Sequence, residues 1–259
     1  MSDFDPGPPA VFATHFSASP DYGAYRQHFW YDWGPVFYRG RLDGSARVLC
    51  IASDPGPTER VAGRTLVGDA GQRVQGFLAK LGLTRSYLCL NAFTYALFPS
   101  HGAAAPTVLA DPVIAAWRNG LYDAAVTPSL EAIIAFGANA QQAVQLWTTK
   151  PALNVAAIPH PSSRNAQALL TAWRAAILDL RTTVTPDPDG DPTVPNYGAT
   201  FREQDYAAIP SRDLPFGVPS WLGDDAWGRR AKPAHNNSVD RPSPDDHHTL
   251  RWIAPVGTH

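Results

Sequence analysis

Residues 47–57 read RVLCIASDPGP, a short apolar run that stops at a turn of Ser, Asp, Pro and Gly. A continuous apolar run of this length is typical of a strand buried on both faces, as in parallel sheets. Three later segments have the same character, at residues 86–91, 130–136 and 153–158. We therefore expect four buried strands.

Helical spacing of apolar residues separates and follows these strands. The predicted helices cover residues 71–81, 112–125, 140–147 and 166–180. Strands that alternate with helices predict an α/β fold with a parallel sheet covered by helices on both faces. The expected architecture is a three-layer α/β/α domain with a central four-stranded parallel sheet.

The chain divides into three parts by composition. Residues 1–45 are rich in aromatic residues, Pro and Gly, and we expect an irregular lead-in packed on the core. Residues 46–181 hold the regular pattern. Residues 182–259 carry 11 of the 25 prolines and no clear periodicity. They predict a long, irregular, acidic extension that wraps the domain, anchored by Trp221, Trp227 and Trp252, and their composition is compatible with disorder at the end.

Composition and charge exclude several classes of protein. The 259 residues are 44% apolar, which is enough for a full core, and contain no apolar run of about 18 residues that could span a membrane. The first residues lack the pattern of a secretory signal. Two cysteines are too few for a disulfide scaffold or a four-cysteine metal or iron–sulfur site, so we expect a reduced, cytoplasmic environment.

The charge is unevenly distributed. The net charge of −2 argues against a protein that coats nucleic acid. Residues 1–181 hold 14 cationic and 12 anionic side chains, whereas residues 182–259 hold 7 and 11. Arginine supplies 18 of the 21 cations. Arginine suits forked contacts to phosphate, although genome composition explains such a bias equally well.

Three polar residues and one glycine lie at or just after the ends of the predicted strands. They are Asp54, Asn91, Gly137 and His160. Ligands of parallel α/β sheets bind beyond the carboxyl ends of the strands. We therefore expect these four positions to meet at one edge of the sheet.

Four short segments occur in a fixed order along residues 46–181. They are ASDPGP at 52–57, GRTLVG at 63–68, LNA at 90–92 and HPSSR at 160–164. In this order, each near a strand end, they resemble the motifs of the uracil-DNA glycosylase superfamily. The resemblance implies that residues 46–181 form a catalytic domain that flips a base out of DNA and cleaves its N-glycosidic bond.

The first segment resembles the water-activating loop of that superfamily. In its best-known family the loop reads Gly-Gln-Asp-Pro-Tyr-His, and Ser53, Asp54 and Gly56 fall on its Gln, Asp and Tyr. Asp54 would then stabilise the cationic sugar and orient the attacking water; the alternative is that it caps the following turn. Gly56 replaces the tyrosine that excludes the methyl group of thymine, so strict discrimination against thymine is not implied, although the iron–sulfur families exclude thymine with a glycine here.

The second segment is similar to the Gly-Arg-Pro-Phe-Val-Gly stretch of the iron–sulfur families. Leu66 stands where their phenylalanine stacks on the base, so another ring must supply the stacking. Phe93, Tyr95 and Phe98 are candidates, and ordinary packing is the alternative for all three. The cluster of those families needs four cysteines, so Cys50 and Cys89 are expected to be small core residues.

Asn91 and His160 match the residues of the superfamily that contact the base. The amide of Asn91 offers one donor and one acceptor, which suits uracil O4 and N3–H and opposes the pattern of cytosine. The alternative is a turn-forming asparagine. His160 would donate to uracil O2 as the leaving base becomes an anion, and the alternative is a structural histidine. We expect His101 to be a solvent-facing loop residue.

Arg164 lies where the superfamily inserts a wedge into the duplex. It would fill the gap left by the flipped base, and a phosphate contact is the alternative. Further DNA contacts are expected from Pro57, Ser100, Ser162 and Ser163. We expect the turn at residues 137–140 to be structural.

Together these residues predict a monofunctional DNA glycosylase that excises uracil with water as the nucleophile and leaves an abasic site. The expected partners are uracil-containing DNA and abasic-site DNA, with a monomer as the working unit and no metal or organic cofactor. None of Lys80, Lys150 and Lys232 lies near the motifs, so no lyase step is implied. The alternative is an abasic-site or damaged-DNA binding protein with slow or no turnover. An unrelated nucleotide or sugar enzyme lacks the phosphate-loop, dinucleotide and nucleophile-elbow motifs.

Overall fold

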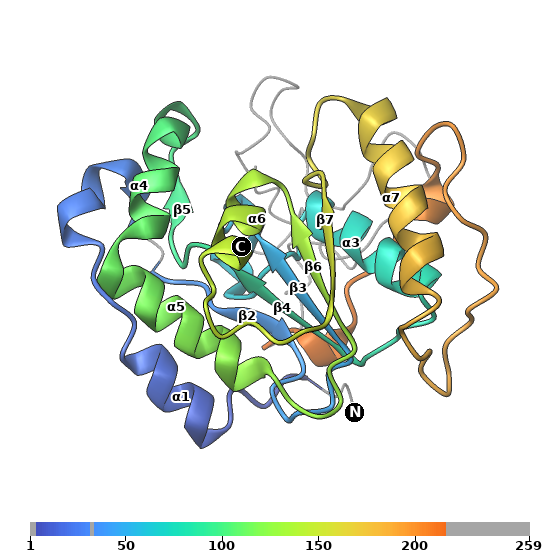
Figure 1. Cartoon of the computed structure of the whole chain (residues 1–259), viewed down its shortest axis with the longest axis horizontal. Helices are drawn as coiled ribbons and strands as arrows, with labels where there is room; N and C mark the ends of the chain where they lie inside the picture. The colour runs from blue at the N-terminus through green and yellow to red at the C-terminus, as the bar shows by residue number, and fades with distance from the viewer. Residues whose placement is uncertain (1–3, 32–33, 216–259) are drawn as a thin grey trace, which may run out of the picture.

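The computed structural model describes residues 4–31 and 34–215. It contains the four predicted parallel strands, whose order in the sheet is β4-β3-β6-β7 (Figure 1). Their bounds are Val48–Ala52 (β3), Tyr87–Asn91 (β4), Ala132–Phe136 (β6) and Asn154–Ile158 (β7). All residues of β3, β4 and β6 are buried, as their continuous apolar composition requires. The prediction of a fully buried strand is wrong for β7, which lies at the edge of the sheet and buries only Ile158.

The sheet has a fifth strand that the sequence pattern did not predict. Strand β2 (Tyr38–Gly40) pairs antiparallel with β4, so the sheet is mixed rather than wholly parallel. The strand is three residues long and has Arg39 at its centre. A strand this short, with a charged residue at its centre, shows no apolar periodicity in the sequence. Arg39 is buried there because it forms an ion pair with Asp213, described below.

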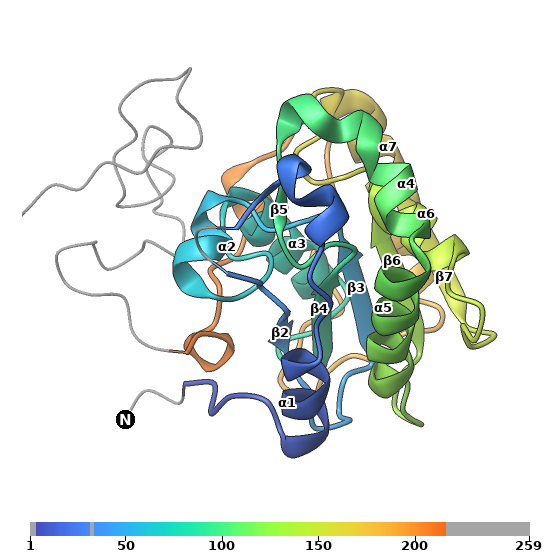
Figure 2. The same ribbon diagram turned by 90° about the vertical axis from the view of Figure 1, so that its left-hand side faces the viewer.

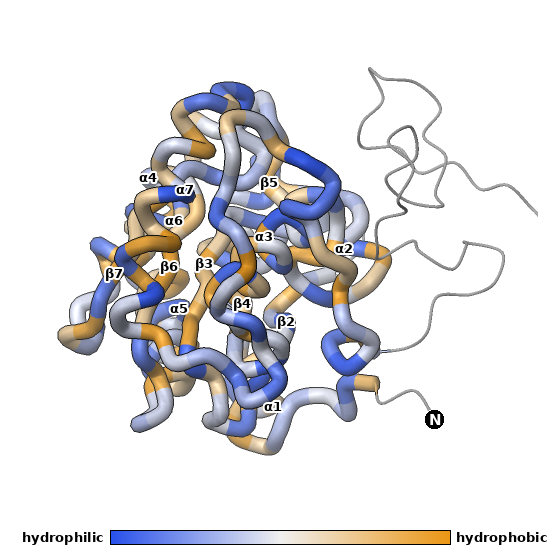
Figure 3. Tube along the Cα trace, turned by 90° about the vertical axis from the view of Figure 1, so that its right-hand side faces the viewer, coloured by the Kyte–Doolittle hydropathy of each residue, from blue (hydrophilic) through white to orange (hydrophobic). Residues whose placement is uncertain are grey.

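Helices cover both faces of the sheet (Figure 1). On one face lie α3 (Asp69–Lys80) and α7 (Ala166–Leu180), and on the other lie α1 (Ala10–Ser17), α4 (Ala105–Ala110), α5 (Pro112–Ala125) and α6 (Ala138–Gln145). Alternate residues of β3 enter the two cores: Leu49 and Ile51 on one side, Val48 and Cys50 on the other. Apolar colour accordingly concentrates in the strands at the centre of Figure 3.

The lead-in is more regular than expected. It forms α1, a 3-10 helix (Gly23–His28), the two-residue strand β1 (Phe29–Trp30) and β2. Helix α1 lies beside α5 (Figure 2), where Trp117 donates a hydrogen bond to the carbonyl of His15. Strand β1 pairs with β5 (Ala96–Leu97). Helix α1 buries Phe12 and Phe16 against the domain. Because a helix of this length is marginal by itself, this packing stabilises it.

Residues 182–215 run along the domain and include two 3-10 turns, Glu203–Asp205 and Ser211–Asp213. Three aspartates of this segment are buried: Asp187, Asp205 and Asp213. The predicted anchors Trp221, Trp227 and Trp252 lie outside the described residues. In residues 182–215, ion pairs and hydrogen bonds of these aspartates therefore hold the segment in addition to aromatic packing. Such contacts produce no periodic pattern in the sequence, so the sequence analysis did not predict them.

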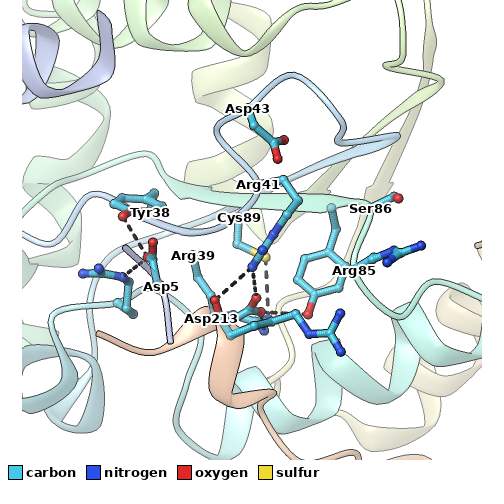
Figure 4. A network of polar contacts seen from close by, with 12 residues as sticks. Asp5, Tyr38, Arg39, Arg41, Asp43, Arg85, Ser86, Cys89 and Asp213 are labelled. Carbon is cyan, nitrogen blue, oxygen red and sulfur yellow. Dashed lines mark hydrogen bonds and ion pairs between the residues drawn. The ribbon is translucent and has the colours of Figure 1, made fainter. Parts of the chain in front are cut away.

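Asp213 is the centre of a buried polar network (Figure 4). Its carboxylate pairs with Arg39 at 2.9 Å and accepts a hydrogen bond from the Tyr87 hydroxyl at 2.7 Å. Arg41 binds the other carboxylate oxygen. Arg39 and Asp213 have no exposed side-chain surface. The network joins the end of the described chain to β2 and β4, so it fixes both the edge strand and the extension.

We expect Asp213→Ala to lower the free energy of unfolding by about 3–5 kcal/mol, because it leaves the buried guanidinium of Arg39 without its counter-ion. Urea denaturation measures this change. The exposed Asp21 provides a matched control, since Asp21→Ala should change stability by no more than about 0.5 kcal/mol. Equal stability of the two variants would contradict a dominant role of the network.

No helix in residues 4–31 and 34–215 is long and apolar enough to cross a membrane.

Candidate functional site

A pocket of about 670 Å³ opens where three loops meet beyond the ends of the parallel strands. The loop after β3 leads into helix α2 (Pro57–Ala62), the second loop leads into α3, and the third follows β7; the first turns of α2 and α3 complete the lining. The pocket thus brings together segments separated by about a hundred positions in sequence. The lining residues are Asp54, Pro55, Gly56, Pro57, Thr58, Glu59, Leu66, Gly68, Asp69, Ala70, Arg73, His160, Ser162, Ser163 and Arg164.

Asp54 is the carboxylate at the end of β3. Its Oδ2 accepts a hydrogen bond from the backbone N–H of Leu97 at 2.9 Å. Burial raises the pKa of Asp54 to about 6, with the nearby charge of Glu59 acting in the same direction. The hydrogen bonds from Ser53 and Leu97 and the charge of Arg60 lower the pKa but do not cancel the effect of burial. Asp54 is therefore ionised at neutral pH while it lies in a poorly solvated place.

His160 follows β7 and is held in one tautomer. Its Nδ1 accepts a hydrogen bond from the backbone N–H of Ser162 at 3.1 Å, so the ring proton is on Nε2. Burial lowers the pKa of His160 to about 4, which keeps the imidazole neutral at pH 7. The side chain thus presents a neutral N–H donor.

The turn after β6 determines how closely His160 can approach. Gly137 has a φ of 87°, and a Cβ atom there would lie 2.8 Å from Cβ of His160. Only glycine fits both the backbone conformation and this contact. Two positions later, Nδ2 of Asn139 donates to the hydroxyl of Ser53 at 2.9 Å. The sequence predicts a structural role for this turn. In the structure it contacts the Asp54 loop through Asn139 and the His160 loop through Gly137.

Asn91 ends β4 and pairs in register with Ala52, two positions before Asp54. Its side chain is buried, and neither Nδ2 nor Oδ1 has a hydrogen-bond partner. Such an amide is unusual in a native protein and costs free energy unless something binds to it. Asn91 lies at the same edge of the sheet as Asp54 but is not among the residues that line the pocket surface.

Leu66 lines the pocket in a strained conformation. It is the one non-glycine residue in the described part of the chain with a positive φ, at 53°. The carbonyl of Leu66 lies against α3, where a Cβ atom on Gly71 would be 1.7 Å from it. Strained backbone of this kind is characteristic of binding sites.

Glu59 holds the loop that contains Leu66, and the sequence analysis missed it. Its Oε1 accepts hydrogen bonds from the backbone N–H groups of Val67 at 2.9 Å and Gly68 at 2.8 Å. A Cβ atom on Gly56 would lie 2.6 Å from the other oxygen. A larger residue at position 56 would therefore displace Glu59. The sequence shows only a carboxylate five residues after Asp54. Its hydrogen-bond partners, Val67 and Gly68, are identified by the tertiary structure.

The other predicted contact residues divide into two groups. Pro57, Ser162, Ser163 and Arg164 line the pocket, and Ser162 and Arg164 are exposed. Phe93 is fully buried against Phe29 in the core, and Ser100 is exposed in the 3-10 helix Pro99–Ala104. Neither lines the pocket. Among the residues that the sequence analysis did not single out, Thr58, Asp69 and Arg73 do.

Cys50 and Cys89 are buried free thiols on paired strands. In the described residues, no group of three or more His, Cys, Asp and Glu side chains is arranged to hold a metal ion.

Comparison with known families gives one match. The model described as the uracil DNA glycosylase superfamily matches residues 39–181, more than half of the chain. No curated protein matches the sequence significantly.

The raised pKa of Asp54 predicts a pH-dependent stability difference between the protein and Asp54→Asn. The carboxyl has a pKa of about 6 in the folded protein and an ordinary value of 3.8. The ionised group therefore destabilises the folded state at pH 7, and this penalty disappears as the pH falls through 6 towards 3.8. We expect Asp54→Asn to be the more stable protein at pH 7 and to lose that advantage by about pH 4.

The free energy of unfolding of both proteins, measured by urea denaturation between pH 4 and pH 8, tests this prediction. The contribution of His160 to the pH dependence is common to both and cancels in the difference. A difference that does not vary with pH would show that Asp54 titrates normally.

Proposed function

Because the chain belongs to the uracil-DNA glycosylase superfamily, we propose that it is a monofunctional enzyme that excises uracil from DNA. The superfamily suggests DNA as the partner and glycosidic cleavage as the reaction. The observation that carries the proposal is that one pocket contains an ionised, poorly solvated carboxylate and a neutral imidazole with its proton on Nε2.

Asp54 acts on the sugar side of the bond. Departure of the base leaves positive charge on the deoxyribose, and a carboxylate in a poorly solvated pocket stabilises that charge more strongly than one in water. The same carboxylate orients the water that attacks the anomeric carbon. The raised pKa supports this role, because the carboxylate is charged at neutral pH but incompletely stabilised by its surroundings.

His160 acts on the base side. The uracil leaves as an anion with charge on O2, and the Nε2–H of His160 donates a hydrogen bond to that oxygen. A neutral donor suits this task because the low pKa keeps the proton on the imidazole while the charge develops on the base. The backbone N–H of Ser162 keeps the ring in the required tautomer.

Asn91 selects the base. Its unpartnered amide offers an acceptor to N3–H and a donor to O4 of uracil. Cytosine presents the opposite pattern and would leave these buried groups unpaired. Because Asn91 is buried and is not among the residues that line the pocket of the free protein, we propose that the base enters more deeply than the open pocket.

The rim of the pocket receives the DNA. Ser162, Ser163 and the backbone at Pro57 contact phosphates, and the exposed Arg164 fills the gap left by the flipped nucleotide. Gly56, beside Glu59, leaves no side chain to exclude the methyl group of thymine. The relative excision of uracil and thymine from otherwise identical duplexes measures how far the pocket tolerates that group.

We expect Asp54→Asn to lower the single-turnover rate of uracil excision by at least about 10²-fold, because it removes the charge that stabilises the transition state. Binding to the same oligonucleotide should remain within about threefold in a gel shift. Unchanged excision would remove Asp54 from the mechanism. A wild-type protein that binds abasic DNA tightly but excises nothing would instead support a binding protein on the same fold.

We expect Asn91→Leu to separate stability from activity. Replacing a buried, unpartnered amide by an apolar group of similar size should leave the free energy of unfolding unchanged or raise it by about 1 kcal/mol. The rate of uracil excision should fall by about 10²-fold, because the base loses both contacts. Loss of stability in this variant would indicate that Asn91 is bonded within the protein and does not await a ligand.

A further inference from the structure

We propose that Phe201, in the segment after α7, is a positioning residue that holds the His160 loop in place through Arg73 and Trp173. This inference rests on the proposed function for its catalytic consequence.

The loop around His160 is fixed at the two residues that flank it. The carbonyl of Pro159 accepts a hydrogen bond from Nε1 of Trp173 at 2.9 Å. The carbonyl of Pro161 accepts one from Nη1 of Arg73 at 2.8 Å. These donors come from α7 and α3, the two helices on one face of the sheet, so the position of His160 depends on where both side chains lie.

Phe201 contacts both donors. The guanidinium carbon of Arg73 lies 4.8 Å from the centre of the Phe201 ring, a cation–π distance. The indole of Trp173 meets the same ring edge-to-face, with centroids 6.1 Å apart and an interplanar angle of 86°. One aromatic ring thus supports the two side chains that hold the two carbonyls beside His160.

Neighbouring rings complete this support. Tyr206 lies 5.3 Å from the guanidinium of Arg73 and packs on Phe201, and Tyr197 packs on both Trp173 and Phe201. We call Tyr197, Phe201 and Tyr206 the aromatic brace. The brace is formed entirely by residues outside the 39–181 match.

The brace is itself anchored to the domain on both sides of Phe201. Before it, Asn196 donates to the carbonyl of Arg174, and Arg174 donates to the carbonyl of Gly198, each at 3.0 Å. After it, Asp205 forms a buried ion pair with Lys80 at 2.8 Å. Phe201 therefore belongs to a fixed segment rather than to a loose strand of chain.

Through these contacts the segment influences the position of His160, although it does not touch the reacting atoms. Phe201 does not line the pocket, whereas Arg73 and His160 do. Removing the ring takes away one support of each donor, leaving Arg73 with its ion pair to Asp69 and Trp173 with its packing on Phe77 and Phe136. A displacement of about 1 Å in a catalytic donor can lower a rate by about 10²-fold.

The first test is spectroscopic and needs no substrate. In the full chain, the ¹⁵N shifts of the His160 ring report its tautomer, and His160→Gln identifies the signals. The wild-type protein should show one protonated Nε2 and one unprotonated Nδ1. Phe201→Ala should move the two shifts towards each other, because the loop no longer holds Nδ1 against the Ser162 amide, and Phe201→Tyr should restore the wild-type pattern.

The second test measures excision of uracil from a single-stranded oligonucleotide. Phe201→Ala should lower kcat by about 10- to 100-fold with KM within about twofold, and Phe201→Tyr should stay within about threefold of wild type. Val184→Ala is the matched control, since it removes two buried methyl groups from the same extension in the same core. It should lower the melting temperature without changing the His160 spectrum or kcat.

The outcomes separate the two proposals. A Phe201→Ala protein with the wild-type tautomer pattern and kcat overturns the brace. A wild-type protein that excises no uracil overturns the proposed function, while the ¹⁵N spectra still decide whether Phe201 holds the loop. If Phe201→Ala does not fold, Phe201→Leu keeps the apolar volume but removes the ring beneath Arg73, and the same shift in the spectrum is then expected.

Discussion

The in-register pairing of the parallel strands is the constraint on which the site depends. Pairing of Ala52 with Asn91 and of Ile51 with Ala135 brings the ends of β3, β4 and β6 to one edge. Register pairing of Phe136 with Ile158 adds the end of β7. Asp54 and His160 therefore line one pocket at this edge, while Asn91 lies at the same edge outside the pocket lining. A shift by one residue would turn every side chain of a strand to the other core. The same apolar residues that build the sheet therefore also assemble the pocket.

The site contains several features that oppose folding. Asp54 is an ionised carboxylate in a place that raises its pKa, Asn91 is a buried amide without partners, and Leu66 has a positive φ. Each is unfavourable by itself. The apolar residues buried in the two cores supply the free energy that maintains them. This division is expected where a protein must stabilise a transition state rather than its own ground state.

The segment after α7 has a closer relation to the pocket than its irregular composition suggests. Its aspartates pair with buried cations and backbone donors, and its aromatic rings pack against residues that hold the His160 loop. An acidic segment is poorly suited to contact DNA directly. Supporting the His160 loop through Arg73 and Trp173, without contact to DNA, is a role that its charge and its contacts both favour.

Local sequence determined the four parallel strands, the main helices and the order of the residues at the strand ends. Burial imposes a periodicity of apolar residues that can be read one segment at a time. The sequence motifs also singled out Asp54, Asn91 and His160. Tertiary structure alone decided the antiparallel strand around Arg39, the contacts of Glu59 and the aromatic brace. Arg39 meets Asp213 across 174 positions of sequence, and a partner so distant leaves no local pattern, because an ion pair or hydrogen bond constrains only the two groups that form it.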